Sequence, residues 1–114
     1  MEFTKSLTKN YEFKRLYNKG KSAASKSVVL YYMKNGKAEN GLGITVSTKL
    51  GGAVQRNRIR RRLKEIYRLN EHTLQPGFNI ILVARQGSRY AAWSELLSSV
   101  LHLFRKTGLQ RAVD

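Results

Sequence analysis

The stretch that decides the fold spans residues 49–68 and reads KLGGAVQRNRIRRRLKEIYR. After a break at two successive glycines, apolar residues recur at Ile59, Leu63 and Ile66. This i, i+4, i+7 spacing predicts a helix with one buried stripe. The opposite side of the same helix carries Asn57, Arg60, Arg61, Lys64 and Arg68. We therefore expect a rod whose back is anchored in a core and whose front presents cations and one amide to a polyanion.

The charge balance of the whole chain points to the same kind of partner. Among 114 residues, 22 are Lys or Arg and 7 are Asp or Glu, which gives a formal net charge of +15 at pH 7. So large an excess repels itself in the compact state, and a bound polyanion relieves that repulsion. The length suits one domain with a modest core, so residues 1–114 are expected to form a single RNA-binding domain.

A membrane surface is the competing polyanion. No apolar run approaches the ~20 residues needed to span a bilayer, and neither a lipidation motif nor a secretory signal is evident. The absence of cysteine excludes a disulfide framework and a cysteine-based zinc site. We expect a cytoplasmic protein that binds nucleic acid, with no membrane association and no protein partner predicted.

The remaining pattern predicts the order α-β-β-α-β-α around one small sheet. A short helix capped by Thr8 or Asn10 should follow an irregular leader and stop at Gly20. Strands are expected at 27–33 and 43–48, paired with each other, and at 78–85, whose near-continuous apolar run fits a central strand. The basic helix should end near residue 70, and a second long helix should cover residues 90–106. Residues 21–26 are expected to form a loop, and the tail from residue 107 is expected to fray.

The chain offers little for independent catalysis. Its acidic residues are scattered singly, whereas a nuclease that acts alone usually gathers carboxylates around metal ions or uses histidines as acid and base. Glu65 lies within one helical turn of several arginines and is predicted to be an ion-pair partner. His72 is expected in a loop and His102 on the solvent side of its helix. We predict no catalytic residue and no metal ligand.

The sequence offers more residues suited to binding nucleic acid than to catalysis. Arginine offers planar bidentate donors to phosphate, and an exposed aromatic ring can stack on a base. Two alternatives stay open for the helix: its cations are simply a solvated face, or Asn57 only caps its first turn. For Phe13 a place in the core competes with a role in binding, because a short helix needs a buried face.

The chain resembles the protein component of bacterial ribonuclease P. The resemblance is carried by residues 49–61, with Arg-Asn-Arg at 56–58, and by residues 10–22, 29–31, 43–47 and 101–106. It implies an α+β fold, in which a small mixed sheet and helices form an α/β sandwich similar to a ribosomal-protein domain. It also implies that the basic helix lies in a left-handed βαβ crossover, an exception to the usual right-handed rule.

The resemblance further implies an accessory role beside a catalytic RNA that holds the metal ions, so Mg²⁺ is expected through that RNA and no cofactor is expected to bind the protein tightly. The second expected partner is precursor tRNA, whose 5′ leader the enzyme removes. The residues implied for a leader cleft are Phe13, Tyr17, Tyr31, Thr45, Asn57, Arg60 and Lys64. Those implied for RNA contact along the basic helix and its approach are Lys49, Arg56, Arg58, Arg61, Arg62 and Arg68.

Two other functions compete with this one. A general RNA-binding or ribosome-associated protein would show the same charge pattern. A self-sufficient ribonuclease would have to bring His72 and His102 together, which nothing in the sequence requires.

Overall fold

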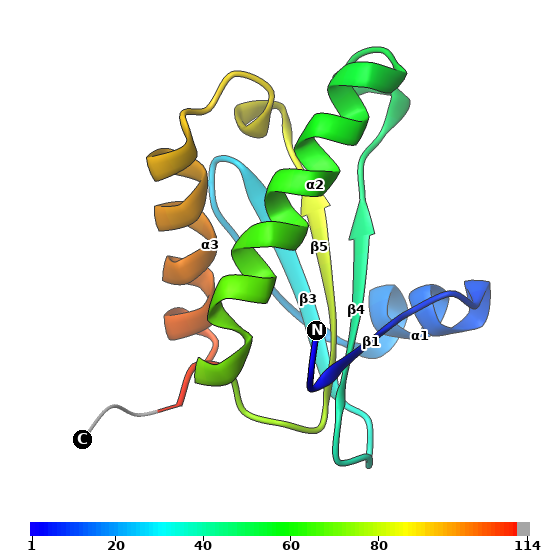
Figure 1. Cartoon of the computed structure of the whole chain (residues 1–114). Helices are drawn as coiled ribbons and strands as arrows, with labels where there is room; N and C mark the ends of the chain where they lie inside the picture. The colour runs from blue at the N-terminus through cyan, green and yellow to red at the C-terminus, as the bar shows by residue number, and fades with distance from the viewer. Residues whose placement is uncertain (112–114) are drawn as a thin grey trace.

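The computed structural model describes residues 1–111, which form one sheet and three α-helices (Figure 1). The strands are β1 (Thr4–Ser6), β2 (Lys21–Ala24), β3 (Val28–Lys34), β4 (Asn40–Thr45) and β5 (Phe78–Ala84). The helices are α1 (Asn10–Lys19), α2 (Ala53–Asn70) and α3 (Trp93–Lys106). Single turns of 3₁₀ helix cover Thr48–Leu50, Glu71–Thr73 and Gln86–Ser88.

The strands form one mixed sheet in the order β1-β4-β5-β3-β2. Strand β5 lies at its centre, parallel to β4 and antiparallel to β3. Helix α2 connects β4 to β5, and Figure 1 shows this crossover to be left-handed: with α2 in front of the sheet and both strands pointing up, the chain moves from right to left. The predicted central strand and the left-handed crossover are both confirmed.

The sheet is covered on both faces. Alternate residues of β5 point to opposite faces of the sheet. Ile80 and Leu82 lie in the core on the face covered by α2 and α3, and Ile81 lies on the face covered by α1. Helix α2 contributes its predicted stripe, with Ile59, Leu63 and Ile66 at most 1% exposed. The periodicity of residues 59–66 is therefore explained by packing, and the cations opposite this stripe face outward.

Several sequence predictions about the sheet were wrong. Residues 4–6 are the edge strand β1 rather than irregular, and residues 21–24 are the opposite edge strand β2 rather than a loop. The strand expected at 43–48 spans Asn40–Thr45 and pairs with β1 and β5, not with β3. Short edge strands carry too few residues to show alternation, and their hydrogen bonds come from a neighbour that is distant in sequence.

The helix ends also differ from the predictions. Lys9, not Thr8 or Asn10, precedes α1, and its backbone N–H donates to the Glu12 carboxylate at 3.1 Å. Helix α3 begins at Trp93, three residues later than expected. The tail does not fray over its described part, because Leu109 is buried and its carbonyl accepts from the Gln75 N–H at 2.7 Å. Residues 112–114 of the tail lie outside the described residues.

No helix within residues 1–111 combines the length and the apolar character that crossing a bilayer demands.

Candidate nucleic-acid interface

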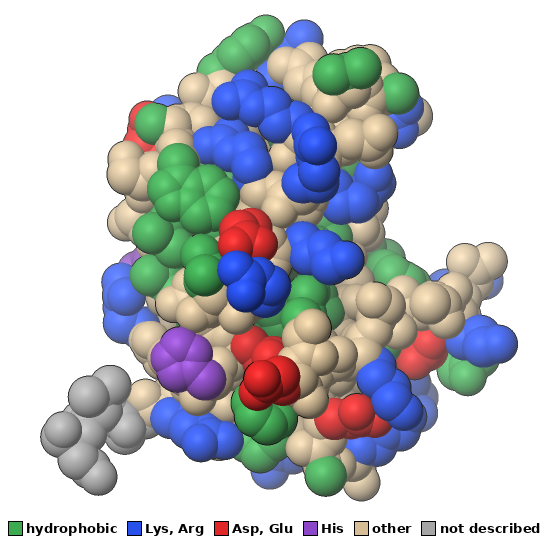
Figure 2. Space-filling view, in the orientation of Figure 1, with side chains coloured by type: hydrophobic (Ala, Val, Ile, Leu, Met, Phe, Trp, Pro, Cys, Tyr) green, Lys and Arg blue, Asp and Glu red, His purple; other side chains and the backbone are tan. Residues whose placement is uncertain are grey.

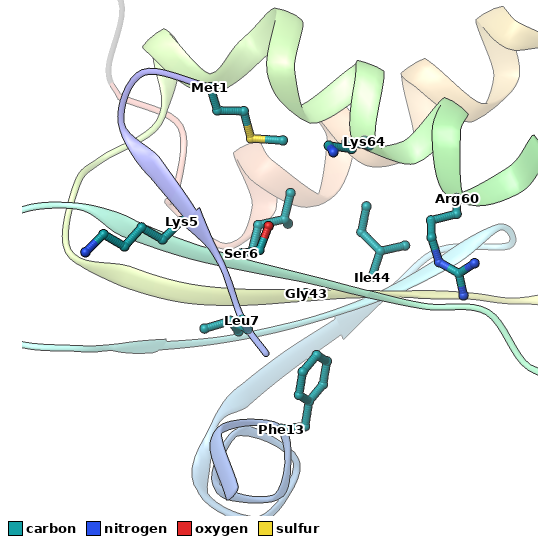
Figure 3. A pocket seen from close by; sticks show the side chains of 10 residues that line it. Met1, Lys5, Ser6, Leu7, Phe13, Gly43, Ile44, Arg60 and Lys64 are labelled. Atoms are coloured by element: carbon teal, nitrogen blue, oxygen red, sulfur yellow. The ribbon is translucent and has the colours of Figure 1, made fainter. Parts of the chain in front are cut away.

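A cleft of about 200 Å³ opens between α1 and α2 at the β4 edge of the sheet (Figure 3). Strand β1 pairs with β4 only as far as Ser6 opposite Leu42, and the Leu7 N–H donates to the Leu42 carbonyl at 2.9 Å. Past this point no strand of the described chain covers the outer edge of β4. The cleft therefore lies where β1 ends and leaves β4 uncovered at Gly43 and Ile44.

The floor of the cleft depends on a glycine. A Cβ at position 43 would lie 2.6 Å from a ring carbon of Phe13 and 3.4 Å from Ile81, so only glycine lets the ring lie against β4. Phe13 itself is half-buried and lines the cleft. Its two expected roles are thus compatible: one part of the ring packs on the sheet and another part faces the cleft.

Three further residues of the expected leader cleft lie beside Phe13, on α1, β3 and β4. The Tyr17 hydroxyl and the Thr45 hydroxyl are hydrogen-bonded at 3.0 Å. The Tyr17 ring meets the Tyr31 ring edge-on, with 4.9 Å between centroids, and lies 6.5 Å from that of Phe13. Tyr17 is 39% exposed, so part of this residue remains accessible within the aromatic cluster.

The opposite wall of the cleft is cationic. Arg60 and Lys64 are one turn apart on α2, and Figure 3 shows both on the side of the helix that borders the cleft. Arg60 Nη1 donates to Asn57 Oδ1 at 3.2 Å, which links the amide to this wall. The suggestion that Asn57 caps the helix is wrong, because α2 already begins at Ala53 and Gly52 occupies the capping position.

The other expected RNA contacts divide into two groups. Three arginines already have partners within the protein: Arg56 Nε donates to the Gly51 carbonyl at 3.2 Å, Arg62 Nη2 donates to the Ala91 carbonyl at 2.8 Å, and Arg68 binds both carboxylate oxygens of Glu65. The last contact confirms the predicted ion pair of Glu65. Its hydrogen bond to Arg68 holds the pKa of this carboxyl below its usual value.

The second group comprises the fully outward cations. Arg58, Arg61 and Lys49 are exposed, and the ion pairs within residues 1–111 are Lys5–Glu39 and Arg68–Glu65, so none of these three cations is neutralised by a carboxylate. Figure 2 shows Lys and Arg side chains gathered over α2, in the upper half of the view. Helix α2 and the turn before it thus present positive charge that no described carboxylate neutralises.

The described residues do not provide a metal site of their own. Within residues 1–111 no three His, Cys, Asp or Glu side chains gather closely enough to hold an ion. His72 lies in the 3₁₀ turn after α2, and His102 is exposed on α3.

Sequence reasoning missed one wall of the cleft. Met1, Lys5, Ser6 and Leu7 line it from the N-terminal segment. A signal was present in the glycines of β4, which alternate at 41 and 43 on one face. A Cβ on Gly41 would lie 2.5 Å from a methyl group of Leu7, so this glycine accommodates the missed segment.

Glu71 anchors that segment and was also missed. The residue is 7% exposed, and its carboxylate accepts from the Glu2 N–H at 3.1 Å and from the Phe3 N–H at 3.3 Å. The Thr4 hydroxyl is hydrogen-bonded to the Tyr67 hydroxyl at 2.8 Å. Burial raises the pKa of Tyr67, so its hydroxyl keeps its proton at neutral pH. The end of α2 thereby holds β1 beside the cleft.

We expect Glu71→Gln to loosen β1 without unfolding the protein. The substitution removes a charged acceptor of two backbone N–H groups, and hydrogen bonds to charged groups contribute roughly 1.5–3 kcal/mol each. The measurement is amide hydrogen exchange at Asn40, whose N–H donates to the Phe3 carbonyl, and it should speed up by about tenfold or more. Glu95→Gln, in the first turn of α3, is the matched control; unchanged exchange at Asn40 in Glu71→Gln would refute the anchor.

Comparison with known proteins identifies relatives for nearly the whole chain. A family model described as Ribonuclease P matches residues 1–108. The chain is 38% identical over 109 residues to the ribonuclease P protein component of Alkaliphilus metalliredigens, which covers 96% of this chain and 98% of the relative. It is 45% identical over 103 residues to that of Thermoanaerobacter pseudethanolicus, with 90% and 89% covered.

Solved structures agree with these sequence relatives. The ribonuclease P protein of Staphylococcus aureus superposes with a TM-score of 0.86 at 32% identity, over 93% of this chain and 97% of the other. That of Thermotoga maritima superposes with a TM-score of 0.82 at 28% identity, over 90% and 96%.

Proposed function

Because this chain belongs to the ribonuclease P protein family, we propose that its cleft binds the 5′ leader of precursor tRNA while the RNA subunit cleaves the bond. As a ribonuclease P protein component it is a subunit of that endoribonuclease, acts in tRNA 5′ processing and has a partner RNA subunit.

One observation supports the leader site: the Phe13 ring forms one wall of the cleft, with Tyr17 beside it, and cations form the other wall. Single-stranded nucleic acid is held in this way, with bases stacked on rings and the backbone following positive charge. Phe13 and Tyr17 offer the rings, and Arg60 and Lys64 offer the cations, across the uncovered edge of β4. A duplex is a poorer occupant, because its bases already stack on each other.

The proposal assigns the outward cations of α2 and of the 3₁₀ turn before it to the RNA subunit. Arg58, Arg61 and Lys49 are exposed and have no carboxylate partner among the described residues. We assign the Mg²⁺ ions of the reaction to the RNA subunit, because no described cluster of carboxylates fits them. The protein's contribution is then to add cations where two phosphate backbones approach each other. Such work belongs in the cytoplasm, beside newly made tRNA.

Reconstitution with a bacterial catalytic RNA at low Mg²⁺ tests this function. The protein should increase 5′ cleavage of precursor tRNA, and the gain should shrink as Mg²⁺ rises because the added cations do the same work. If six to ten phosphates are contacted, RNA affinity should fall roughly 10³- to 10⁵-fold between 50 and 200 mM salt. No stimulation at low Mg²⁺, or affinity indifferent to salt, would overturn the proposal.

The same assay addresses the general RNA-binding alternative. A leader site predicts tighter binding of precursor tRNA than of leaderless mature tRNA, whereas a general RNA-binding protein would bind both equally. Cleavage by protein free of RNA, abolished by His72→Ala or His102→Ala, would instead support a self-sufficient nuclease.

A further inference from the structure

A second aromatic group lies outside the cleft, in the loop between β5 and α3. Tyr90 is 81% exposed, which packing in the core does not explain. The Arg89 guanidinium carbon lies 5.2 Å from the centroid of its ring, so one face of the ring is stacked on a cation. Trp93, three residues later at the start of α3, is also 40% exposed.

This loop is anchored on both sides of the exposed ring. Ala91 is nearly buried, and its carbonyl accepts from Arg62 Nη2 of α2 at 2.8 Å. Before the ring, the buried Ser88 hydroxyl donates to the Arg85 carbonyl at 2.7 Å, and Arg85 Nη1 donates to the Ser25 carbonyl at 2.9 Å. Tyr90 is therefore presented outward by a fixed loop.

The surroundings of the loop are strongly positive. Arg58 lies one turn before Arg62 on α2, and burial together with this neighbouring cation lowers the pKa of Arg62. Arg89 Nε is buried and has no hydrogen-bond partner among the described residues. The carboxylate closest in sequence, Glu95, accepts from the Ala92 N–H at 3.4 Å and starts α3. One guanidinium group is thus stacked on the exposed ring, and two more lie on the flank of α2 that contacts the loop.

We propose that Tyr90 is a stacking platform for an unpaired base of the RNA subunit, with the adjacent phosphates bound by Arg58 and Arg89. The inference rests on the proposed function and extends it to a second contact. A ring beside guanidinium groups suits a nucleotide, since the base gains a stacking partner and the phosphate gains a charge partner. An apolar protein partner would leave these cations buried and unpaired.

The position of the platform favours the RNA subunit over the leader. The cleft uses Arg60 and Lys64, which face β4 and α1. The platform instead adjoins Arg62, which contacts the loop before α3. Arg60 and Arg62 are two residues apart, which corresponds to a rotation of about 200° around the axis of an α-helix. The cleft and the platform therefore lie on opposite flanks of α2. Tyr90 does not line the cleft, so we assign it to a second RNA segment.

Binding of the RNA subunit alone to Tyr90→Ala and Tyr90→Phe tests the platform. Loss of the ring should weaken binding about 5- to 150-fold, the range expected for one stacked base, whereas Tyr90→Phe keeps the ring and should bind within about twofold of the unchanged protein. Tyr11→Ala removes a similarly exposed tyrosine, 68% exposed on α1, and is the matched control. Equal binding by Tyr90→Ala and the unchanged protein would overturn the proposal, as would an equal loss in Tyr90→Phe.

Two further readouts separate stacking from other causes. A tyrosine ring neutralises no phosphate, so Tyr90→Ala should leave the slope of log K for RNA binding against log salt concentration unchanged. Arg58→Ala removes one cation and should reduce that slope by about one. Trp93 is the only tryptophan, and its fluorescence should change when the RNA subunit binds. A Tyr90→Ala defect seen only with precursor tRNA, or only with a protein partner, would overturn the assignment to the RNA subunit.

Failure of this inference is distinguishable from failure of the proposed function. If the unchanged protein stimulates 5′ cleavage and Tyr90→Ala binds the RNA subunit equally well, only the platform is refuted. If the unchanged protein neither binds the RNA subunit nor stimulates cleavage, both are refuted.

Discussion

Reversing the charges of Arg60 and Lys64 together, as Arg60→Glu with Lys64→Glu, should weaken binding of leader-bearing precursor tRNA roughly 100-fold at 100 mM salt. The estimate assumes the loss of two charge-assisted contacts to phosphate at about 1.5 kcal/mol each. Both residues form the cationic wall of the cleft, and neither is in an ion pair within residues 1–111. The reversed charges would face the leader phosphates at the same positions, so the effect should shrink as salt screens it.

The measurement compares precursor tRNA with leaderless mature tRNA. Affinity of the holoenzyme for mature tRNA should change by less than about threefold, because the cleft is proposed to contact only the leader. The matched control reverses two exposed cations far along the chain, as Arg105→Glu with Lys106→Glu at the end of α3. Equal losses for the two pairs would show a general effect of net charge, and equal losses on the two tRNAs would exclude a leader site at this wall.

Gly43→Ala should destabilise the protein by roughly 1–3 kcal/mol, the usual cost of overpacking a tight site. The added methyl would lie 2.6 Å from the Phe13 ring, and a contact this short forces the ring, and with it α1, away from β4. Thermal unfolding should shift down by about 4 °C or more for each kcal/mol lost. Leader-dependent affinity should fall as well, because the displaced ring lines the cleft.

Two variants isolate the cause of the Gly43→Ala effect. Gly52→Ala adds the same methyl at a site where nothing lies within 4 Å, and it should cost far less. In a Phe13→Ala background the obstacle is gone, so Gly43→Ala should cost at least 1 kcal/mol less than it does alone, a coupling that a double-mutant cycle measures. Additive effects of the two substitutions would show that the cost of Gly43→Ala arises from the backbone and not from contact with the Phe13 ring.

The residues around α1 show where sequence reasoning reached the site and where it stopped. Phe13, Tyr17, Tyr31 and Thr45 were named from a family resemblance, and the structure brings these four residues into one contiguous surface. Their contact with a leader remains a proposal. The N-terminal wall was missed, because a three-residue edge strand has no periodicity of its own and pairs with β4 across a gap of more than thirty residues.

Glu71 and Tyr90 were misjudged for related reasons. Glu71 is a lone acidic residue in the sequence, and only its burial against the Glu2 and Phe3 N–H groups shows that it anchors β1. Tyr90 was expected within the last helix, but the chain turns outward before α3 starts at Trp93. A pattern of apolar residues locates a helix well and its first turn poorly, since the first turn needs fewer buried contacts.

The sequence by itself determined the basic helix, its buried and outward faces, the central strand, the excess of positive charge and the family. These follow from local periodicity, from composition and from a distinctive motif, none of which depends on what lies nearby in space. Only the tertiary structure decided which strand pairs with β4, where its edge is left uncovered and which flank of α2 faces the cleft. Those features depend on contacts between segments far apart in the chain, whose hydrogen bonds and packing leave no periodic trace in either segment alone.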